Sequence, residues 1–244
     1  MIHIFRKIRK KLADDNRPIQ YMRYAIGEIV LVVIGILIAL QINNWNEERK
    51  MKNVTERYIK RLIADIELDT LSIHEALKVR QRSSNNIISY FDFFHASSAS
   101  LETLIDTALT VGFELRRYIP VNFTFTDMQT TGNLDLLSQE QQQALLELAH
   151  MQKTAQLVAE VRMDEYYIEN SERNKYMSAR PNLYPIDYYR KFGFQKDPKF
   201  MVQGLIHTNN MLMILKDYHE YQSILGKEII IASKETIEIL KNEK

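Results

Sequence analysis

Two pairs of acidic and histidine residues have the spacing of a helical metal-binding motif. They are Glu147 with His150 and, as a weaker copy, Asp92 with His95. Residues three apart share one side of a helix, and glutamate–histidine pairs of this kind ligate iron in di-iron bundles. However, 31 acidic residues and 6 histidines among 244 positions make about one such pair expected by chance. We therefore expect neither a metal site nor a cofactor.

The remaining titratable pairs have simpler interpretations. Asp65 and Asp69 lie one helical turn apart and could act in acid–base catalysis, but nearby basic residues favour a solvated, charged helix face. His207 and His219 match no H-E-x-x-H motif, and we interpret each as a surface or hydrogen-bonded histidine. The sequence contains no G-x-S-x-G, P-loop or G-x-G-x-x-G motif. We predict that the chain is not an enzyme.

An aromatic cluster surrounds a segment rich in turn residues. Residues 180–196 contain two prolines and a glycine, which indicates a connecting loop between helices. Tyrosine-rich clusters anchor many interfaces, whereas the alternative is a loop packed by its own rings at the end of a bundle. The candidate interaction patch consists of Tyr184, Tyr188, Tyr189 and Phe192.

The composition favours long helices and excludes several classes of site. Only 7 glycines and 5 prolines are present, too few for the many turns of a sheet protein. The absence of cysteine rules out disulfides, cysteine-bound zinc and cysteine nucleophiles. A net charge of +1 provides no field that would attract nucleic acid, and we expect no nucleic-acid partner.

The most distinctive segment is apolar and long enough to span a bilayer. Between Ile29 and Leu40 no side chain can ionise or form a hydrogen bond. A buried core helix and a cleaved signal peptide are the alternatives, but no cleavage-site pattern follows the run. Tyr21 and Tyr24 precede it and Trp45 follows it, as at membrane interfaces. We predict an uncleaved transmembrane helix over residues 24–45.

Small residues on one face of this segment suggest helix association. Gly35 and Ala39 form a small-xxx-small step, and Gly27 lies two turns earlier. Such faces allow close helix contact, although glycine and alanine are also common in membrane helices for other reasons. Glu28 lies about one turn inside the predicted span, where it either serves a function or extends to the interface. These four residues form our candidate association site in the membrane.

The sidedness follows from the segment before the span. Residues 1–23 are basic and carry an apolar stripe that includes Ile4 and Ile8, which favours an anionic cytoplasmic leaflet. Basic residues are nearly as numerous just after the span, but there they are diluted by glutamates. We expect the N-terminus in the cytoplasm and the large domain across the membrane.

Residues 46–244 predict a helical bundle domain. Periodicity and capping signals place helices at about 46–94, 101–118, 139–177 and 198–241. The signals include Ser100 as an N-cap, a Ser138–Gln141 capping box and Pro198 at a first helical position. Thr126 is predicted to cap a short helix. The fold class is all-α, with the transmembrane helix continuing into an antiparallel four-helix-bundle-like domain.

The segment YAIGEIVLVVIGILIALQINNWNE, preceded by FRKIRKKL, resembles the N-terminal hallmark of an uncharacterised bacterial family of single-pass membrane proteins. FTDMQTTGNLDLL at residues 125–137 resembles the mid-chain pattern of that family more loosely, and a glutamine-rich run after Ser138 departs from it. The resemblance implies a bacterial membrane anchor with a helical domain, and together with the sidedness argued above we expect an inner-membrane location with the large domain in the periplasm. It implies no activity, and no functional residue transfers from it.

Three functions are compatible with these features. The first is an anchored structural or interaction protein that associates with itself or with a membrane partner. The second is an extracytoplasmic, ligand-binding sensory bundle that acts through a membrane partner. The third is a metal-dependent enzyme, which depends on the two acid–histidine pairs alone. We favour the first, because it needs no catalytic chemistry.

Overall fold

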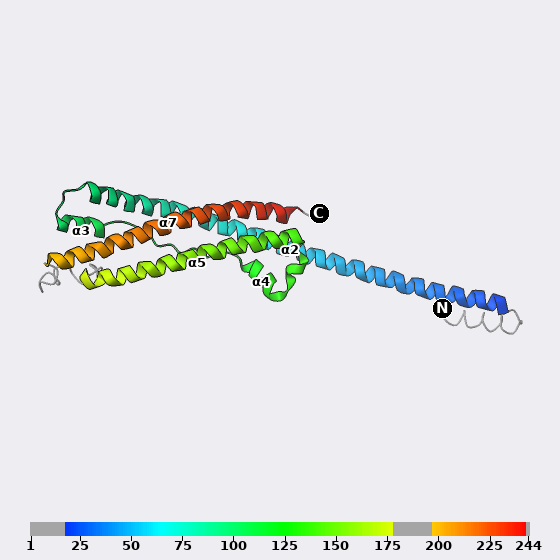
Figure 1. Ribbon diagram of the computed structural model, residues 1–244. Coiled ribbons are helices and arrows are strands. Elements are labelled where there is room, and N and C mark those ends of the chain that lie inside the picture. The colour runs from blue at the N-terminus through cyan, green and yellow to red at the C-terminus, as the bar shows by residue number, and fades with distance from the viewer. Residues whose placement is uncertain (1–17, 178–196, 243–244) are drawn as a thin grey trace. The chain divides into compact units, whose positions relative to one another are not determined.

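A computed structural model describes residues 18–177 and 197–242, and every regular element within them is a helix (Figure 1). This confirms the predicted all-α class. The chain divides into two compact units, residues 1–57 and 58–244. The elements in chain order are α2 (Pro18–Ala96), α3 (Leu101–Leu109), α4 (Phe123–Thr131), the 3-10 helix η1 (Asn133–Leu136), α5 (Gln139–Tyr176) and α7 (Pro198–Lys241).

Helix α2 contains 79 residues without a break, as the absence of internal proline and turn signals predicts. In the first unit its apolar side chains are exposed. In the second unit, Tyr58 and Ile59 are the first α2 residues to pack against the core. The compact helical unit therefore begins at Tyr58, later than the predicted start of the bundle domain at residue 46.

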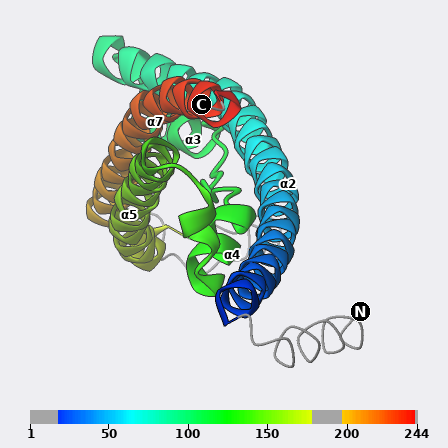
Figure 2. The same cartoon turned by 90° about the vertical axis from the view of Figure 1, so that its right-hand side faces the viewer.

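The second unit has the up-down-up-down order of a four-helix bundle. The part of α2 after Tyr58 runs in the same direction as α5, and α7 returns antiparallel to both (Figure 1). Viewed along the bundle, α5 and α7 lie side by side, with α3 and α4 between them and α2 (Figure 2). The start of α5 and the end of α7 are joined by a hydrogen bond, in which Gln141 Nε2 donates to the Leu240 carbonyl at 3.4 Å.

The second leg of the bundle differs from the expected helix over 101–118. Helix α3 ends at Leu109, and residues 110–122, here called the strap, continue without helical structure. Thr110 ends the helix by donating its hydroxyl to the Thr107 carbonyl, and two β-branched residues followed by Gly112 do not favour its continuation. Side chains of α2 then satisfy strap backbone groups: Ser83 accepts from Glu114 N, and Asn86 donates to the Gly112 carbonyl.

Local capping signals set most of the helix boundaries as predicted. Ser100 accepts from Thr103 N, and Ser138 forms a reciprocal capping box with Gln141. Gly132 ends α4 in the left-handed conformation at φ 73°, which glycine adopts at low cost. The predicted Thr126 cap was wrong, because α4 begins three residues earlier, at Phe123, and the first-turn amide of Thr124 donates to Asp65 of α2.

Two hydrophobic clusters fill the bundle. The first joins α2, α4, α5 and α7 around Leu62, Met128, Leu148 and Ile229. The second lies toward the α3 end of the bundle, around Ile87, Met163, Leu212, Leu215 and Tyr218. Each fully buried large side chain contributes about 1.5–3 kcal/mol relative to exposure. Three long helices can therefore be held together without disulfides.

Candidate functional site

The apolar run of α2 has no packing partner in its own unit. Every residue from Ile29 to Leu40 is exposed, including Leu31 at 62% and Leu37 at 59%. This excludes a buried core helix as the explanation of the run. Within the described residues, α2 is the one helix long and apolar enough to cross a membrane, and its span lies near the N-terminus. That finding fits both a membrane anchor and a signal sequence.

The small residues of this span lie on an open helix surface. A Cβ atom added to Gly27 or Gly35 would meet no other atom within 4 Å. Ala39 is exposed and Glu28 is partly buried. No internal contact therefore requires glycine at these two positions, and the face is free for lipid or for another helix. The association hypothesis stays a prediction.

The predicted aromatic patch falls in residues 178–196. Tyr184, Tyr188, Tyr189 and Phe192 therefore lie outside the described residues. Next to this segment, the Tyr176 ring stacks on His207 at 5.6 Å between centroids and lies 5.8 Å from Phe200. The end of α5 and the start of α7 are thus joined by packed rings.

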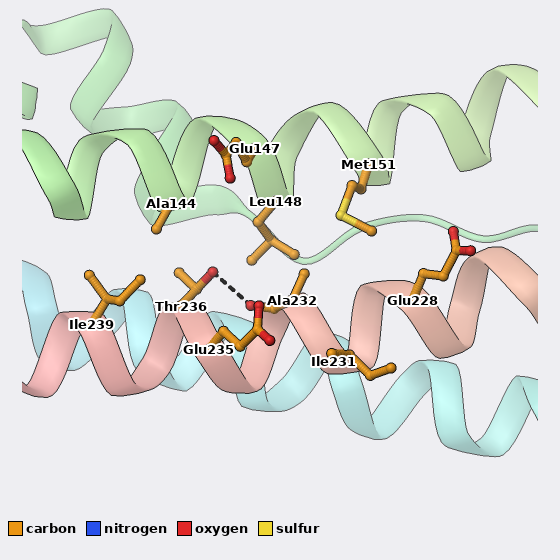
Figure 3. A pocket seen from close by; sticks show the side chains of 10 residues that line it. All are labelled: Ala144, Glu147, Leu148, Met151, Glu228, Ile231, Ala232, Glu235, Thr236 and Ile239. Carbon is orange, nitrogen blue, oxygen red and sulfur yellow. Dashed lines mark hydrogen bonds between the residues drawn. The ribbon is translucent and has the colours of Figure 1, made fainter.

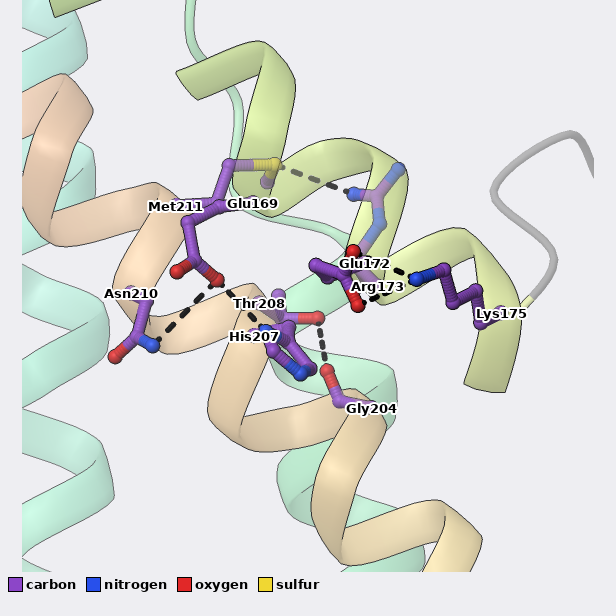
Figure 4. Close-up of polar contacts among 9 residues, drawn as sticks. All are labelled: Glu169, Glu172, Arg173, Lys175, Gly204, His207, Thr208, Asn210 and Met211. Carbon is purple, nitrogen blue, oxygen red and sulfur yellow. Dashed lines mark hydrogen bonds and ion pairs between the residues drawn. The ribbon is translucent and has the colours of Figure 1, made fainter. Parts of the chain in front are cut away.

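Polar contacts strengthen the same junction (Figure 4). His207 Nδ1 lies 2.7 Å from Glu169 Oε2, which confirms that His207 is a hydrogen-bonded histidine. The Arg173 side chain is buried, with Nη2 donating to Asn170 at 2.7 Å and Nη1 lying 3.5 Å from Met211 Sδ. These contacts hold α5 against α7, although the buried Nε of Arg173 has no hydrogen-bond partner in the described residues.

Asp69 corrects our interpretation of the Asp65–Asp69 pair as a solvated face. Its side chain is fully buried and accepts three hydrogen bonds: from Tyr118 Oη at 2.7 Å, from Val121 N at 2.9 Å and from Gln152 Nε2 at 2.9 Å. Burial raises the pKa of Asp69, because desolvation of the charged form outweighs the three hydrogen bonds. Asp69 therefore fastens the strap and α5 to α2.

Asp65 acts one turn away, on the start of α4. Its Oδ2 accepts from Thr124 N at 2.8 Å, in the first turn of that helix. The N-cap residue Asn122 makes no side-chain capping bond of its own, so the carboxylate of α2 replaces the missing cap. We call Asp65 and Asp69 together the carboxylate clamp. Asp69 is fully buried and Asp65 is partly buried, and both carboxylates accept hydrogen bonds that hold the strap and α4 to α2.

A second group of buried polar side chains joins α2 to α7. Arg80 Nη1 donates to the Gln222 carbonyl at 3.2 Å, and Gln222 Nε2 donates to the Ala155 carbonyl of α5 at 2.8 Å. His219 is 1% exposed, and neither ring nitrogen has a hydrogen-bond partner in the described part of the chain. This corrects our expectation of a surface or hydrogen-bonded histidine. Desolvation, followed by the Arg80 charge, lowers the pKa of His219 to about 4.

A helical register could have revealed these buried polar residues in the sequence. On α2 the apolar positions Leu62, Ile66 and Ile73 follow a spacing of three and four that includes Asp69. On α7 the same spacing from Leu212 and Leu215 includes His219. Asp69 and His219 therefore occupy core positions of their helices. The prediction that they lie at the surface depended on their residue type and not on their helical register.

The acid–histidine pairs lie on exposed helix surfaces. Glu147 and His150 are exposed on α5, and Asp92 and His95 are exposed near the end of α2. Across the described residues, no three histidine, aspartate or glutamate side chains gather as metal ligands would. Neither pair is therefore joined by the further carboxylates that a di-iron site requires.

Two grooves mark the surface of the bundle. One, of about 350 Å³, lies between α5 and α7 and is lined by Leu148, Ala232 and three glutamates (Figure 3). The other, of about 460 Å³, lies between the end of α2 and α7, with Phe91 and Phe94 among its lining residues. Both are open, mainly apolar surfaces suited to binding.

The comparisons with known proteins bear on the first part of the chain. A model of a family of unknown function (DUF6090) matches residues 28–98, from just before the apolar run to just beyond the end of α2. Comparison with curated proteins and with solved structures found no significant match. The mid-chain resemblance at residues 125–137 lies outside the matched range. Residues 28–98 are thus similar to a family whose function is unknown.

Proposed function

We propose that this chain is a single-pass membrane-anchored interaction protein, without catalytic activity, whose helical bundle binds partners beside the membrane. The observation that carries the proposal is the exposure of the whole apolar run from Ile29 to Leu40. Its ten valine, isoleucine and leucine side chains, at about 1.5–3 kcal/mol each, represent roughly 15–30 kcal/mol of unfavourable exposure in water. Transfer of the run from water into lipid is favourable by a free energy of this size, which supports a membrane anchor.

The anchor is proposed to lie in a bacterial inner membrane, with the N-terminus in the cytoplasm and the bundle in the periplasm. The basic residues before the span support this orientation. A reporter enzyme that is active only after export, fused after Lys244, should be active in whole cells. A fusion that is active only as a cytoplasmic reporter would reverse the topology.

The anchor itself is tested by extraction of membranes at alkaline pH. The full chain should stay with the lipid pellet, and a variant with Ile34→Lys and Leu37→Lys should be released, because two central cations make insertion unfavourable by about 5–7 kcal/mol. A matched variant with Lys at the exposed positions Glu67 and Glu160, outside the run, should stay in the pellet. Release of the unaltered chain into the aqueous phase would contradict the anchor, and N-terminal sequencing would detect cleavage of a signal sequence.

Self-association through the span is proposed to use Gly27, Gly35 and Ala39. The open surface at both glycines supports this, since a second helix can approach closely there. Cross-linking in membranes should detect a dimer that is lost in Gly35→Ile and kept in Val33→Ile, which enlarges the opposite face. A strictly monomeric chain would remove this association without affecting the anchor.

A sensory role is the second candidate, and the groove at the end of α2 favours it. Phe91, Phe94 and Met213 provide apolar walls, and Asn209 and Lys216 add polar groups, as in small-ligand sites. A ligand of this groove should raise the melting temperature of the full chain, and the shift should vanish in Phe94→Ala. No response to a broad set of small molecules would count against this candidate.

A further inference from the structure

The outer face of α7 carries a largely exposed apolar stripe, in which only the Tyr221 ring has a cation over it among the described residues, the Arg162 guanidinium at 5.5 Å from its centroid. Tyr221, Ile224 and Ile231 are 49%, 54% and 58% exposed. Glu228 and Glu235 continue the series, so the five positions follow the spacing of three and four that a helix presents to a second helix. Apolar side chains in such a row favour contact with an apolar helix face.

The stripe borders the groove between α5 and α7. Leu148 and Ala232 lie in the groove, Ile231 projects beside it, and Met151 lines the α5 side (Figure 3). Glu147 lies on the α5 side of the groove. An apolar groove of about 350 Å³ edged by carboxylates on both helices accepts one row of side chains from a docked helix.

The carboxylates of the groove are not neutralised within the bundle. No residue in the described ranges forms an ion pair or hydrogen bond with the side chain of Glu228 or Glu235, whereas Glu220 on the same helix pairs with Lys216 at 2.8 Å. Glu147 accepts only from the neutral Gln143 amide, at 2.9 Å. Of the ten residues that line the groove, none is basic. The lining of the groove is therefore acidic, which complements a cationic partner.

We propose that this face docks a basic amphipathic helix of a partner protein, with an apolar seam in the groove and lysine or arginine beside the three glutamates. The inference deepens the proposed function, on which it rests, by giving the chemistry of the partner. A second copy of the chain does not fit, because a symmetric contact would place glutamates against glutamates. Anionic lipid headgroups are repelled for the same reason.

The test uses the full chain in nanodiscs of zwitterionic lipid and a labelled synthetic helix of three heptads, with leucine at the seam and lysine on both flanks. Fluorescence anisotropy measures the Kd, with empty nanodiscs as background. The double variant Glu228→Lys and Glu235→Lys should weaken binding at least about tenfold. The matched double variant Glu67→Lys and Glu160→Lys, which changes the net charge equally at exposed positions elsewhere, should change it less than about twofold.

Two further arms separate the contributions. A peptide with glutamate in place of lysine should bind the Glu228→Lys and Glu235→Lys variant more tightly than it binds the unaltered chain. Ile231→Asp should weaken the lysine peptide, and Leu157→Asp, which alters an apolar residue outside the groove, should not. Equal losses in the groove and control variants would overturn the proposal, because general charge attraction would then explain the binding.

The outcomes distinguish this inference from the proposed function. No peptide binding by a chain that stays in the membrane pellet overturns the docked helix and leaves the anchor intact. The Ile231→Cys variant tests self-association through this face. If two copies of it form a disulfide at full yield and the peptide does not bind, the face serves self-association and the inference is overturned. Release of the chain from membranes would overturn the anchor, while peptide binding would still support the groove.

Discussion

Replacement of Asp69 by alanine is expected to loosen the strap from the rest of the bundle. The carboxylate accepts from a hydroxyl, a backbone amide and a side-chain amide, which belong to Tyr118, Val121 and Gln152. All three donors lie in or beside the core, and alanine offers none of them an acceptor. The same change removes a charged group whose burial is unfavourable, so the net loss is smaller than the sum of three bonds.

The magnitude follows from these opposing effects. Each buried donor left without an acceptor costs about 1–3 kcal/mol, and the removed desolvation penalty offsets part of the total. We expect Asp69→Ala to lower the free energy of unfolding by about 3–5 kcal/mol, or the Tm by about 10 °C for a unit of this size. Asp69→Asn should lose only about 1–2 kcal/mol, because its oxygen can still accept from Val121, and the Tyr118 hydroxyl can accept from its amide.

Thermal unfolding of the full chain in detergent, followed by helical circular dichroism, measures both variants. Glu67→Ala on the same helix is the matched control, since that side chain is exposed. Hydrogen exchange adds a local measurement: the amides of Val121 and Thr124 should lose protection in Asp69→Ala, while those of the α5–α7 pair should not. A loss below about 1 kcal/mol, or equal protection of Val121 in both proteins, would refute the clamp.

Three further changes test the buried polar residues and one turn. The pKa of His219 is lowered to about 4, so the unfolded chain takes up the proton first and the free energy of unfolding decreases as the pH falls from about 6.5 to 4. Denaturant titrations across this range should show a loss of about 3 kcal/mol, and the loss should be smaller in His219→Leu. Arg80→Met should keep the free energy of unfolding within about 1 kcal/mol and move the acid transition of His219 upward, since its cation is removed. Gly132→Ala, at φ 73°, should cost about 1–2 kcal/mol by the same measurement, and Gly112→Ala less.

The helix boundaries could be predicted from the sequence where the signal is local. Ser100, Ser138 and Pro198 each act on residues within one turn, so their effect does not depend on the rest of the fold. The long uninterrupted α2 was predictable for the same reason, because nothing between residues 18 and 96 after the first proline breaks a helix. Boundaries set by local chemistry are accessible without tertiary information.

The strap and the carboxylate clamp could not be predicted in this way. Residues 110–122 form no regular element, and they are held by Ser83, Asn86 and Asp69, which lie between 26 and 52 positions earlier in the chain. No local pattern in the strap specifies those partners. Asp65 shows the same limit, since its role depends on the start of a helix 59 positions away. The basic residues that lie near Asp65 and Asp69 in the sequence therefore did not indicate the surroundings of these two carboxylates in the fold.

The buried polar residues also explain how α2 finds a single register. Its core positions from Leu62 to Tyr90 repeat at intervals of three and four, so a shift by one heptad would again place apolar residues against the core at many positions. Such a shift would carry Asp69 away from the strap and Arg80 away from Gln222. The buried Asp69 carboxylate would then lack its donors, and the buried Arg80 guanidinium would lack its acceptor. Apolar burial holds the helices together, but the polar contacts decide which of several similar packings forms.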